Sequence, residues 1–300
     1  MNATYIDFHT HTALSDGAYT PQQLCAMARD AEIGILALTD HNHSEDLAPL
    51  RAAYPEICFI QGAEISCLYT DAENRELEIH VVALGFDPNH PDIRAVLAHN
   101  QPDRRPYINA ILDRLRLCGI DLGSYEDLRA LHPDTHHIGR MLIAQLLKDR
   151  GFVSTVNEAF DIYIGAFGER RAFVPNPLHY VSMEEAVRAI VRAGGVAVLA
   201  HLYYYRLDDC GCERLLRRFK ELSGPNGAME VFYGRYTSEQ HKALMALADK
   251  YHLMYSAASD FHGQNEIDTL ANRFTASSCA ELLRFLGFRC DPEDPAPSGN

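Results

Sequence analysis

The chain has 300 residues with a hydrophobic content of 47%, which is enough to bury a large core as one domain or as one domain with an insertion. Its formal net charge of −14 argues against a general nucleic-acid coat and against a protein that binds anionic membranes. The sequence shows no signal-peptide pattern and no apolar run of membrane-spanning length. Its eight cysteines are scattered and include no CxxC pair, so we expect a cytoplasmic protein.

Short apolar segments in the pattern of buried strands recur along the chain. Helix starts lie between several of them: Thr20, Ser182 and Thr237 are N-cap residues, each followed three positions later by Gln or Glu. About seven strands separated mostly by helices predict an α/β fold with a parallel sheet or barrel, whose active site lies at the carboxyl ends of the strands. The predicted strands are residues 5–8, 34–38, 57–60, 77–84, 196–200, 229–232 and 253–258.

Residues 89–176 break this alternation. Ile108, Ile111, Leu112 and Leu115 have helical spacing, and Thr155 begins another helix-start pattern. We interpret this stretch as a helical insertion that covers the mouth of the barrel. The barrel itself is then formed by residues 1–88 and 177–290, and the polar, proline-rich residues 291–300 are expected to form a disordered tail.

Histidines and carboxylates follow the predicted strands. His9 and His11 leave the first strand, and residues two apart on a strand point to the same side, so they form a ready pair of metal ligands. Glu64 is expected just after the third strand. Burial of so many polar groups at one rim without a cation would cost about 1–3 kcal/mol for each unpaired group. The recurrence of histidines and carboxylates after several strands therefore predicts a metal cluster. Its other candidate ligands are Asp16, His41, His80, His201, Asp260 and His262.

In their order and spacing these motifs resemble the PHP (polymerase and histidinol phosphatase) family, particularly its stand-alone phosphoesterases that act on nucleotides. The resemblance spans residues 5–263. It implies a seven-stranded (β/α) barrel of PHP type that binds two or three divalent ions of manganese, zinc or iron. The segments that carry it are HTHTALSDG (9–17), ALTDH (37–41), GAEIS (62–66), IHVVALG (79–85), GGVAVLAH (194–201) and SDFH (259–262).

The resemblance distributes the nine candidate ligands over three ions. The first ion is held by His9, His11, Glu64 and Asp260, the second by Glu64, His80 and His201, and the third by Asp16, His41 and His262. The metal ions that Glu64, His9, His11 and Asp260 bind would hold a hydroxide, and this hydroxide would attack the phosphorus atom of the substrate. Asp40 is expected to orient a neighbouring histidine rather than to bind metal. Three divalent ions and three carboxylates leave a local charge of about +3, which traps phosphate in an otherwise acidic protein.

Substrate contacts are expected from the insertion and from the segment after His201. The resemblance implies that His137 and Arg140 reach the substrate phosphate, whereas Thr135 stands where relatives have Arg. Arg170 is a candidate to replace that contact. The alternative is that Arg140 and Arg170 are ordinary solvated or helix-pairing arginines.

The segment after His201 also departs from the family. Its relatives usually continue with Pro, whereas this chain continues with Leu202 and three tyrosines. Tyr204, at the centre of the three, is a candidate for stacking on a base or sugar. The alternative is that the tyrosines are packing and loop residues.

The leading functional hypothesis is hydrolysis of a phosphomonoester of a small nucleotide, such as the 3′-phosphate of a nucleoside 3′,5′-bisphosphate. The alternatives are 5′–3′ exonuclease action on short oligonucleotides and a histidinol-phosphate-type phosphatase. A non-catalytic PHP module is disfavoured because all nine candidate ligands are present, and a three-metal cluster suits phosphate better than a C–N or carboxyl ester bond. We expect no stable nucleic-acid complex and no contact with membranes, and the oligomeric state stays open.

Overall fold

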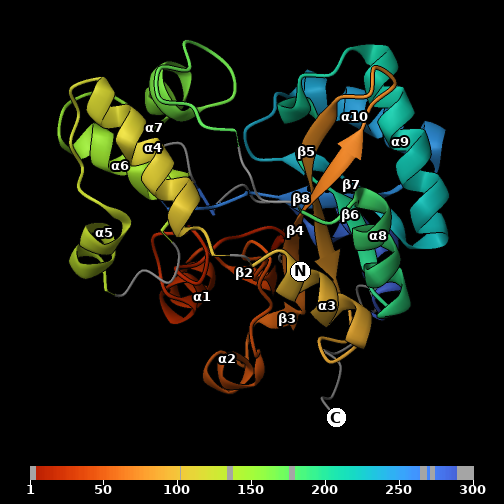
Figure 1. Ribbon diagram of the computed structural model, residues 1–300. Coiled ribbons are helices and arrows are strands. Elements are labelled where there is room, and N and C mark those ends of the chain that lie inside the picture. Colours follow the sequence, from red (N-terminus) through yellow and green to blue (C-terminus); the bar gives the residue numbers. More distant parts are fainter. Residues whose placement is uncertain are drawn as a thin grey trace.

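The computed structural model of the protein describes residues 5–101, 103–133, 138–175, 180–263, 269–270 and 274–288. Within these ranges, eight strands form one three-stranded and one five-stranded sheet, and the helices between them complete an α/β fold (Figure 1). No helix in these ranges is both long enough and apolar enough to cross a membrane. The cytoplasmic location stays a prediction, and the expected tail, 291–300, lies outside the described residues.

The three-stranded sheet is parallel and contains the N-terminal strands in the order β1–β2–β3. The predicted start of the first helix is confirmed, because the Thr20 side chain accepts a hydrogen bond from Gln23 N and the Gln23 side chain accepts one from Thr20 N. The elements of this part are β1 (Tyr5–Asp7), α1 (Pro21–Asp30), β2 (Ile33–Ala37), α2 (Ala48–Ala53) and β3 (Cys58–Ile60).

The five-stranded sheet has the order β4–β5–β6–β7–β8 and mixes strand directions. β5 runs antiparallel to both β4 and β6, whereas β6, β7 and β8 are parallel to one another. The expectation of a purely parallel sheet was therefore wrong. The strands are β4 (Gly62–Thr70), β5 (Glu76–Leu84), β6 (Val196–Leu199), β7 (Gly227–Tyr233) and β8 (Met254–Ala258).

β4 is the strand that was not predicted from the sequence. Glu64, expected just after the third predicted strand, is the third residue of β4. The polar residues Glu64 and Ser66 alternate with apolar ones, which is a strand pattern, but Gln61 alone separates β4 from β3 and the two segments were not told apart. Only residues 71–75 connect β4 to β5, and the Asp71 carboxylate closes this turn by accepting from Arg75 N at 2.8 Å. Such a short connection forces an antiparallel pair, since a parallel crossover needs a dozen or more residues.

Hydrogen bonds join the edges of the two sheets. Phe8 N donates to Ala257 O at 3.0 Å, which links β1 to β8, and Glu64 N donates to Thr39 O at 3.1 Å, which links β4 to the end of β2. Residues from both sheets therefore meet along one rim.

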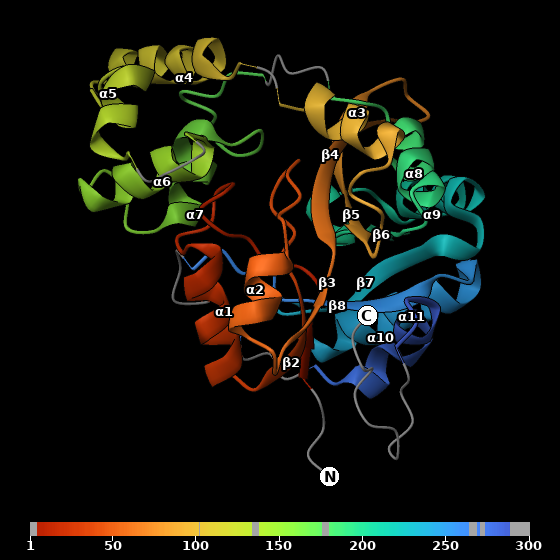
Figure 2. The same ribbon diagram turned by 90° about the horizontal axis from the view of Figure 1, so that it is seen from below.

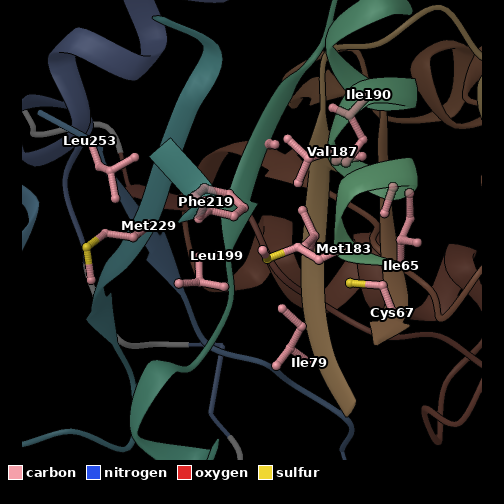
Figure 3. Close-up of a cluster of buried hydrophobic side chains, with 14 of the residues drawn as sticks. Ile65, Cys67, Ile79, Met183, Val187, Ile190, Leu199, Phe219, Met229 and Leu253 are labelled. Carbon is pink, nitrogen blue, oxygen red and sulfur yellow. The ribbon is translucent and has the colours of Figure 1, made fainter. Parts of the chain in front are cut away.

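Three helices pack against the five-stranded sheet and bury the main core. Side chains of the helices pack against those of the strands, as Phe219 does beside Leu199 (Figure 3). The predicted helix starts at Ser182 and Thr237 are confirmed as capping boxes. The helices are α8 (Met183–Arg192), α9 (Asp209–Ser223) and α10 (Ser238–Tyr251), and the short α11 (Ala280–Phe285) follows β8.

A run of helices separates β5 from β6. The predicted helical spacing is confirmed, because Ile108, Ile111, Leu112 and Leu115 are all buried on α4. α4 to α7 share an apolar cluster of their own and lie to one side of the sheets (Figures 1 and 2), whereas α3 packs against α8. The limits 89–176 of the insertion stay a prediction. The helices are α3 (Pro91–His99), α4 (Arg105–Leu117), α5 (Tyr125–Leu131), α6 (Arg140–Asp149) and α7 (Val156–Ala159), continued by the π-helix Phe160–Ile164.

A buried asparagine fixes the point where the chain leaves for these helices and returns from them. Asn100 is only 1% exposed, and its amide nitrogen donates to Asn42 Oδ1 at 2.8 Å and to Ser66 O at 2.7 Å. Its amide oxygen accepts from Val181 N at 3.1 Å on the returning segment. Asn100 therefore ties both connections of the insertion to the segment that follows β2.

We expect Asn100→Ala to lower the free energy of unfolding by about 2–4 kcal/mol, because it leaves three buried polar groups without this partner. Urea unfolding of the variant measures the effect. Asn89→Ala, at an exposed position, is the matched control and should change the stability by less than about 0.5 kcal/mol. Equal stability of the two variants would contradict the anchoring role.

Candidate metal centre

The structure brings all nine predicted ligands to the rim where the two sheets meet. Each follows a strand or lies within one, and their ligand atoms approach one another across both sheets. His9, His11 and Asp16 follow β1, His41 follows β2, Glu64 and His80 lie in β4 and β5, His201 follows β6, and Asp260 and His262 follow β8.

Glu64 lies at the centre of this rim and is 1% exposed. Its Oε1 is 2.9 Å from His80 Nδ1 and 3.2 Å from His201 Nε2, and its Oε2 is 2.9 Å from His41 Nδ1 and 3.3 Å from His11 Nε2. Burial acts to raise the pKa of Glu64, but the charges of His80 and His41 hold it well below its usual range. One carboxylate thus contacts histidines contributed by both sheets.

Three groups of side chains have ligand atoms within 4.8 Å of one another, which suits a cation. The group of His9, His11 and Asp260 lies within the set that the family resemblance gives to the first ion. The other two groups overlap with the expected sets but differ in detail: His41 lies beside Glu64 and His80, and His11 joins Asp16, His41 and His262. His201 belongs to none of these groups, although it contacts Glu64.

In the first group, His9 is oriented for metal ligation. Its Nδ1 lies 2.6 Å from Glu230 Oε1 and donates a hydrogen bond to it, so in the neutral ring Nε2 carries the lone pair. Without a metal, burial acts to lower the pKa of His9, but Glu64 and Glu230 raise it well above its usual value. Nε2 of His9 lies 3.0 Å from Nε2 of His11 and 3.5 Å from Asp260 Oδ1. Two imidazole nitrogens and a carboxylate oxygen therefore converge on one point, the donor set that divalent transition metals prefer.

The group around Asp16 shows the same arrangement. His262 Nδ1 donates to Asp260 O at 2.9 Å, which directs Nε2 to Asp16 Oδ1 at 3.4 Å. Burial acts to lower the pKa of His262, but Asp16 and Asp260 raise it to about 10. In the same way, Glu64 and Asp16 overcome burial and raise the pKa of His41 to about 9. Without a metal, these histidines carry protons that neutralise the carboxylates.

Several buried atoms of the rim lack a hydrogen bond, as expected where a cation would be their partner. Within the described residues, Glu64 Oε2, His41 Nδ1 and His201 Nδ1 have no partner of acceptable geometry, although the first two are 2.9 Å apart. Unpaired buried polar atoms are rare in native proteins and costly, unless another group occupies the space they face. The residues present fit divalent cations.

Backbone conformation at the rim is also unusual. Asn42, His201 and Asp260 have positive φ angles of 52°, 26° and 53°, which side chains other than glycine adopt at a cost. Gly17 is required for a related reason, since a Cβ at this position would lie 2.4 Å from His11 O. Strain of this kind persists where the surrounding structure fixes a functional side chain.

Asp40 organises the segment between the two ligands of the first loop. Its carboxylate accepts from Thr12 N at 2.8 Å, from Thr12 Oγ1 at 2.7 Å and from Ser15 Oγ at 2.5 Å. Ser15 Oγ in turn lies 3.4 Å from Nδ1 of His11. This geometry suits the predicted role of Asp40 as the residue that orients a histidine.

Three residues near the rim were not predicted from the sequence to belong to the site. Glu230, 1% exposed in β7, holds His9 and also accepts from His201 N at 2.7 Å. Tyr233 donates to Asp260 Oδ2 at 2.6 Å, and Glu78 lies 3.5 Å from His80 Nε2. The available signal for Glu230 was a lone acidic residue inside an otherwise apolar predicted strand, since such a charge needs a partner when buried.

Of the expected substrate contacts, Arg140 lies near the rim and Arg170 does not. Arg140 begins α6, where burial acts to lower its pKa while Tyr107 and Glu78, with a further contribution from Asp16, raise it overall. The exposed Arg170 stacks on Phe173 at 4.3 Å and, within the described residues, contacts none of the nine candidate ligands.

The three consecutive tyrosines divide into different roles. Tyr204 is 48% exposed, and its ring centroid lies 5.4 Å from that of His201, beside the candidate metal centre. Tyr205 is a packing residue whose hydroxyl donates to Ala200 O at 2.9 Å. His137 lies outside the described residues.

Comparison with known proteins agrees with this geometry. The PHP domain family matches residues 7–174. The chain belongs to the PHP family. Similar proteins include the 5′-3′ exoribonuclease Rnm of Escherichia coli (strain K12), which is 33% identical over 264 residues that cover 87% of this chain and 86% of that protein.

Another relative is the 3′,5′-nucleoside bisphosphate phosphatase of Chromobacterium violaceum, 31% identical over 263 residues that cover 87% of this chain and 88% of that protein. Among solved structures, an amidohydrolase from Chromobacterium violaceum with bound sulfate and no metal has a TM-score of 0.78 at 29% identity, covering 94% of this chain and 97% of that one. This PHP protein is a hydrolase of phosphoric esters.

We expect Glu230→Gln to weaken the binding of a divalent metal about 10- to 100-fold, because Glu230 fixes the tautomer and orientation of His9. Titration calorimetry with manganese measures the affinity. Glu239→Gln, at an exposed position of α10, is the matched control and should bind metal as the wild type does. Equal affinities of the two variants would rule out the orienting role.

Metal binding near pH 7.5 should release more than two protons per chain. His41 and His262 have pKa values of about 9 and about 10 without metal and bind metal only when neutral, and the pKa values of the candidate ligands His9 and His80 are also raised well above their usual value. The release should diminish as the pH rises through 9 to 10, where His41 and His262 are already neutral. Calorimetry in two buffers of different ionisation enthalpy counts the protons. Metal binding without proton release near pH 7.5 would contradict the assignment of His41 and His262 as ligands.

Proposed function

We propose that this protein hydrolyses the phosphomonoester of a small nucleotide, with the nine residues of the rim as ligands of two or three divalent ions such as manganese, zinc or iron. The observation that carries the proposal is the convergence of six histidines and three carboxylates at one rim, where the buried atoms Glu64 Oε2 and His41 Nδ1 lie 2.9 Å apart without a well-formed hydrogen bond. The two joined sheets would together form the wall of a PHP-type barrel around these ions.

The bound ions would supply positive charge and a water molecule of lowered pKa, the chemistry required for attack on phosphorus. The side chains of the rim do the remaining work. Glu230 and the carbonyl oxygen of Asp260 accept hydrogen bonds from Nδ1 of His9 and of His262, so that the Nε2 atoms of both rings face the site. Arg140 adds a fixed positive charge on the side of the insertion, which favours the approach of a phosphate.

The two relatives suggest which bond is cleaved. A nucleoside 3′,5′-bisphosphate has an ester between its 3′ oxygen and phosphorus, and the same ester links the first two nucleotides of an RNA strand. We propose that this bond, in a nucleotide that also carries a 5′-phosphate, is the target. The net charge of −14 favours the small substrate, because long polyanions are repelled outside the metal site.

A second candidate function is stepwise 5′–3′ trimming of short RNA. It is favoured by the 33% identity to the exoribonuclease of Escherichia coli, which extends over 87% of the chain. Histidinol phosphate is a less suitable substrate, since it lacks a second phosphate for the positive charge of Arg140.

The test is phosphate or nucleotide release by the manganese-loaded protein from adenosine 3′,5′-bisphosphate, AMP, a short 5′-phosphorylated RNA and histidinol phosphate, assayed side by side. We expect the bisphosphate to give the highest kcat/KM. Asp260→Asn should lose at least about 100-fold in rate, because a ligand carboxylate is removed. Asp113→Asn, on the exposed surface of α4, is the control and should retain wild-type activity.

Preference for RNA would replace the leading function by the second. Absence of release from all four compounds would overturn the phosphoesterase proposal for these substrates. Full activity of Asp260→Asn would overturn the assignment of the site.

A further inference from the structure

A cavity of about 350 Å³ lies between the segment after β2 and the helical insertion. Its walls include His41 and His43 on one side and Arg104, Tyr125 and Ile138 on the other. His41 also belongs to two of the three candidate metal groups. A ligand that fills this cavity therefore lies next to the metal centre, on the side of the insertion.

The size of the cavity limits what it can hold. Small-molecule sites typically measure about 300–1,000 Å³, so this cavity belongs to the lower end of that range. It offers room for one small organic group rather than for a folded polymer. Its position between two parts of the chain is also typical of ligand sites, which lie preferentially between domains or layers.

The lining favours a ring system over a second inorganic anion. Tyr125 and His43 present aromatic rings, and Leu14 and Ile138 add apolar surface. Two charged side chains of opposite sign, Asp103 and Arg104, also line the cavity, so together they give no net attraction for an anion. Flat rings with a polar edge, such as nucleobases, bind to aromatic side chains with polar groups around them.

The walls are held in place by contacts that the candidate metal centre does not use. Gln101 donates to Asn42 O at 2.7 Å, so the outgoing connection is fixed against the segment between His41 and His43. Asn109 Oδ1 accepts from Tyr125 N at 2.8 Å and fixes the start of α5. A site whose walls are already fixed loses little entropy when it binds a ligand.

We propose that this cavity is the subsite for the nucleoside part of the substrate, with the base against Tyr125 and His43 while the phosphate lies at the metal centre beyond His41. This inference rests on the proposed nucleotide phosphoesterase function and adds the residues that recognise the base. In this arrangement the insertion selects the substrate, and the rim of the sheets carries out the hydrolysis.

The test compares a nucleotide with a phosphate ester that has no nucleoside. For the manganese-loaded protein, we expect His43→Ala and Tyr125→Ala each to lower the ratio of kcat/KM for adenosine 3′,5′-bisphosphate to that for p-nitrophenyl phosphate at least about fivefold, because each removes a ring that supports the base. Tyr125→Phe retains the ring and should retain the ratio. Tyr54→Ala, beside α2 and away from the cavity, is the control.

A second readout does not depend on hydrolysis. Calorimetry should show that His43→Ala weakens the binding of AMP at least about fivefold, in the protein with and without manganese. His43 is a suitable second variant because, within the described residues, its side chain has one polar contact, 3.4 Å from Glu45, and belongs to no core cluster, whereas Tyr125 packs against one.

The outcomes separate the subsite from the proposed function. An unchanged ratio in both alanine variants, while the wild type hydrolyses the bisphosphate, overturns the subsite and leaves the function in place. If the wild type hydrolyses only p-nitrophenyl phosphate, the proposed nucleotide function fails, and weaker AMP binding by His43→Ala still supports a nucleoside site. Equal AMP binding by His43→Ala and the wild type overturns the subsite.

Discussion

The arrangement of the rim depends on one buried carboxylate. Glu64 is the third residue of β4, and its two oxygens contact histidines that come from both sheets. A charge in this position is tolerated only when it is paired, and in the absence of metal the surrounding imidazoles take up protons to pair it. The same crowding makes the site suitable for divalent cations, because an ion can replace those protons and contact several ligands at once. The metal centre and the fold are therefore coupled through a single residue.

The sequence predicted the parts of the fold that have a local signal. Helix starts such as Thr20 and Ser182 are defined by residues three apart, so they could be identified from the chain alone. β4 was not identified, because Gln61 alone separates it from β3 and no turn pattern marks where one strand ends and the next begins. Seven of the nine candidate ligands follow strand ends, which is why their gathering could be predicted, whereas Glu64 and His80 lie within β4 and β5. Glu230 was missed because its contact with His9 joins residues 221 positions apart, and only the folded chain brings them together.

The insertion and the sheets have separate cores but a shared boundary. α4 to α7 bury their own apolar cluster, while Asn100 and its hydrogen bonds tie their two connections to the segment that carries His41. The anchoring contacts involve none of the nine candidate ligands, since Asn100 bonds to Asn42, Ser66 and Val181. This division agrees with relatives that share the PHP domain and yet differ in named substrate, one an exoribonuclease and one a nucleotide phosphatase.

The most direct test of the central claim is the metal content of the purified protein, measured by elemental analysis for the wild type and Glu64→Gln prepared side by side from manganese-supplemented cultures. The account predicts about two or three divalent ions per wild-type chain and fewer in the variant, because Glu64 contacts the histidines of more than one candidate ion. Equal metal content in both proteins, or full activity of the wild type after complete removal of metal, would contradict it.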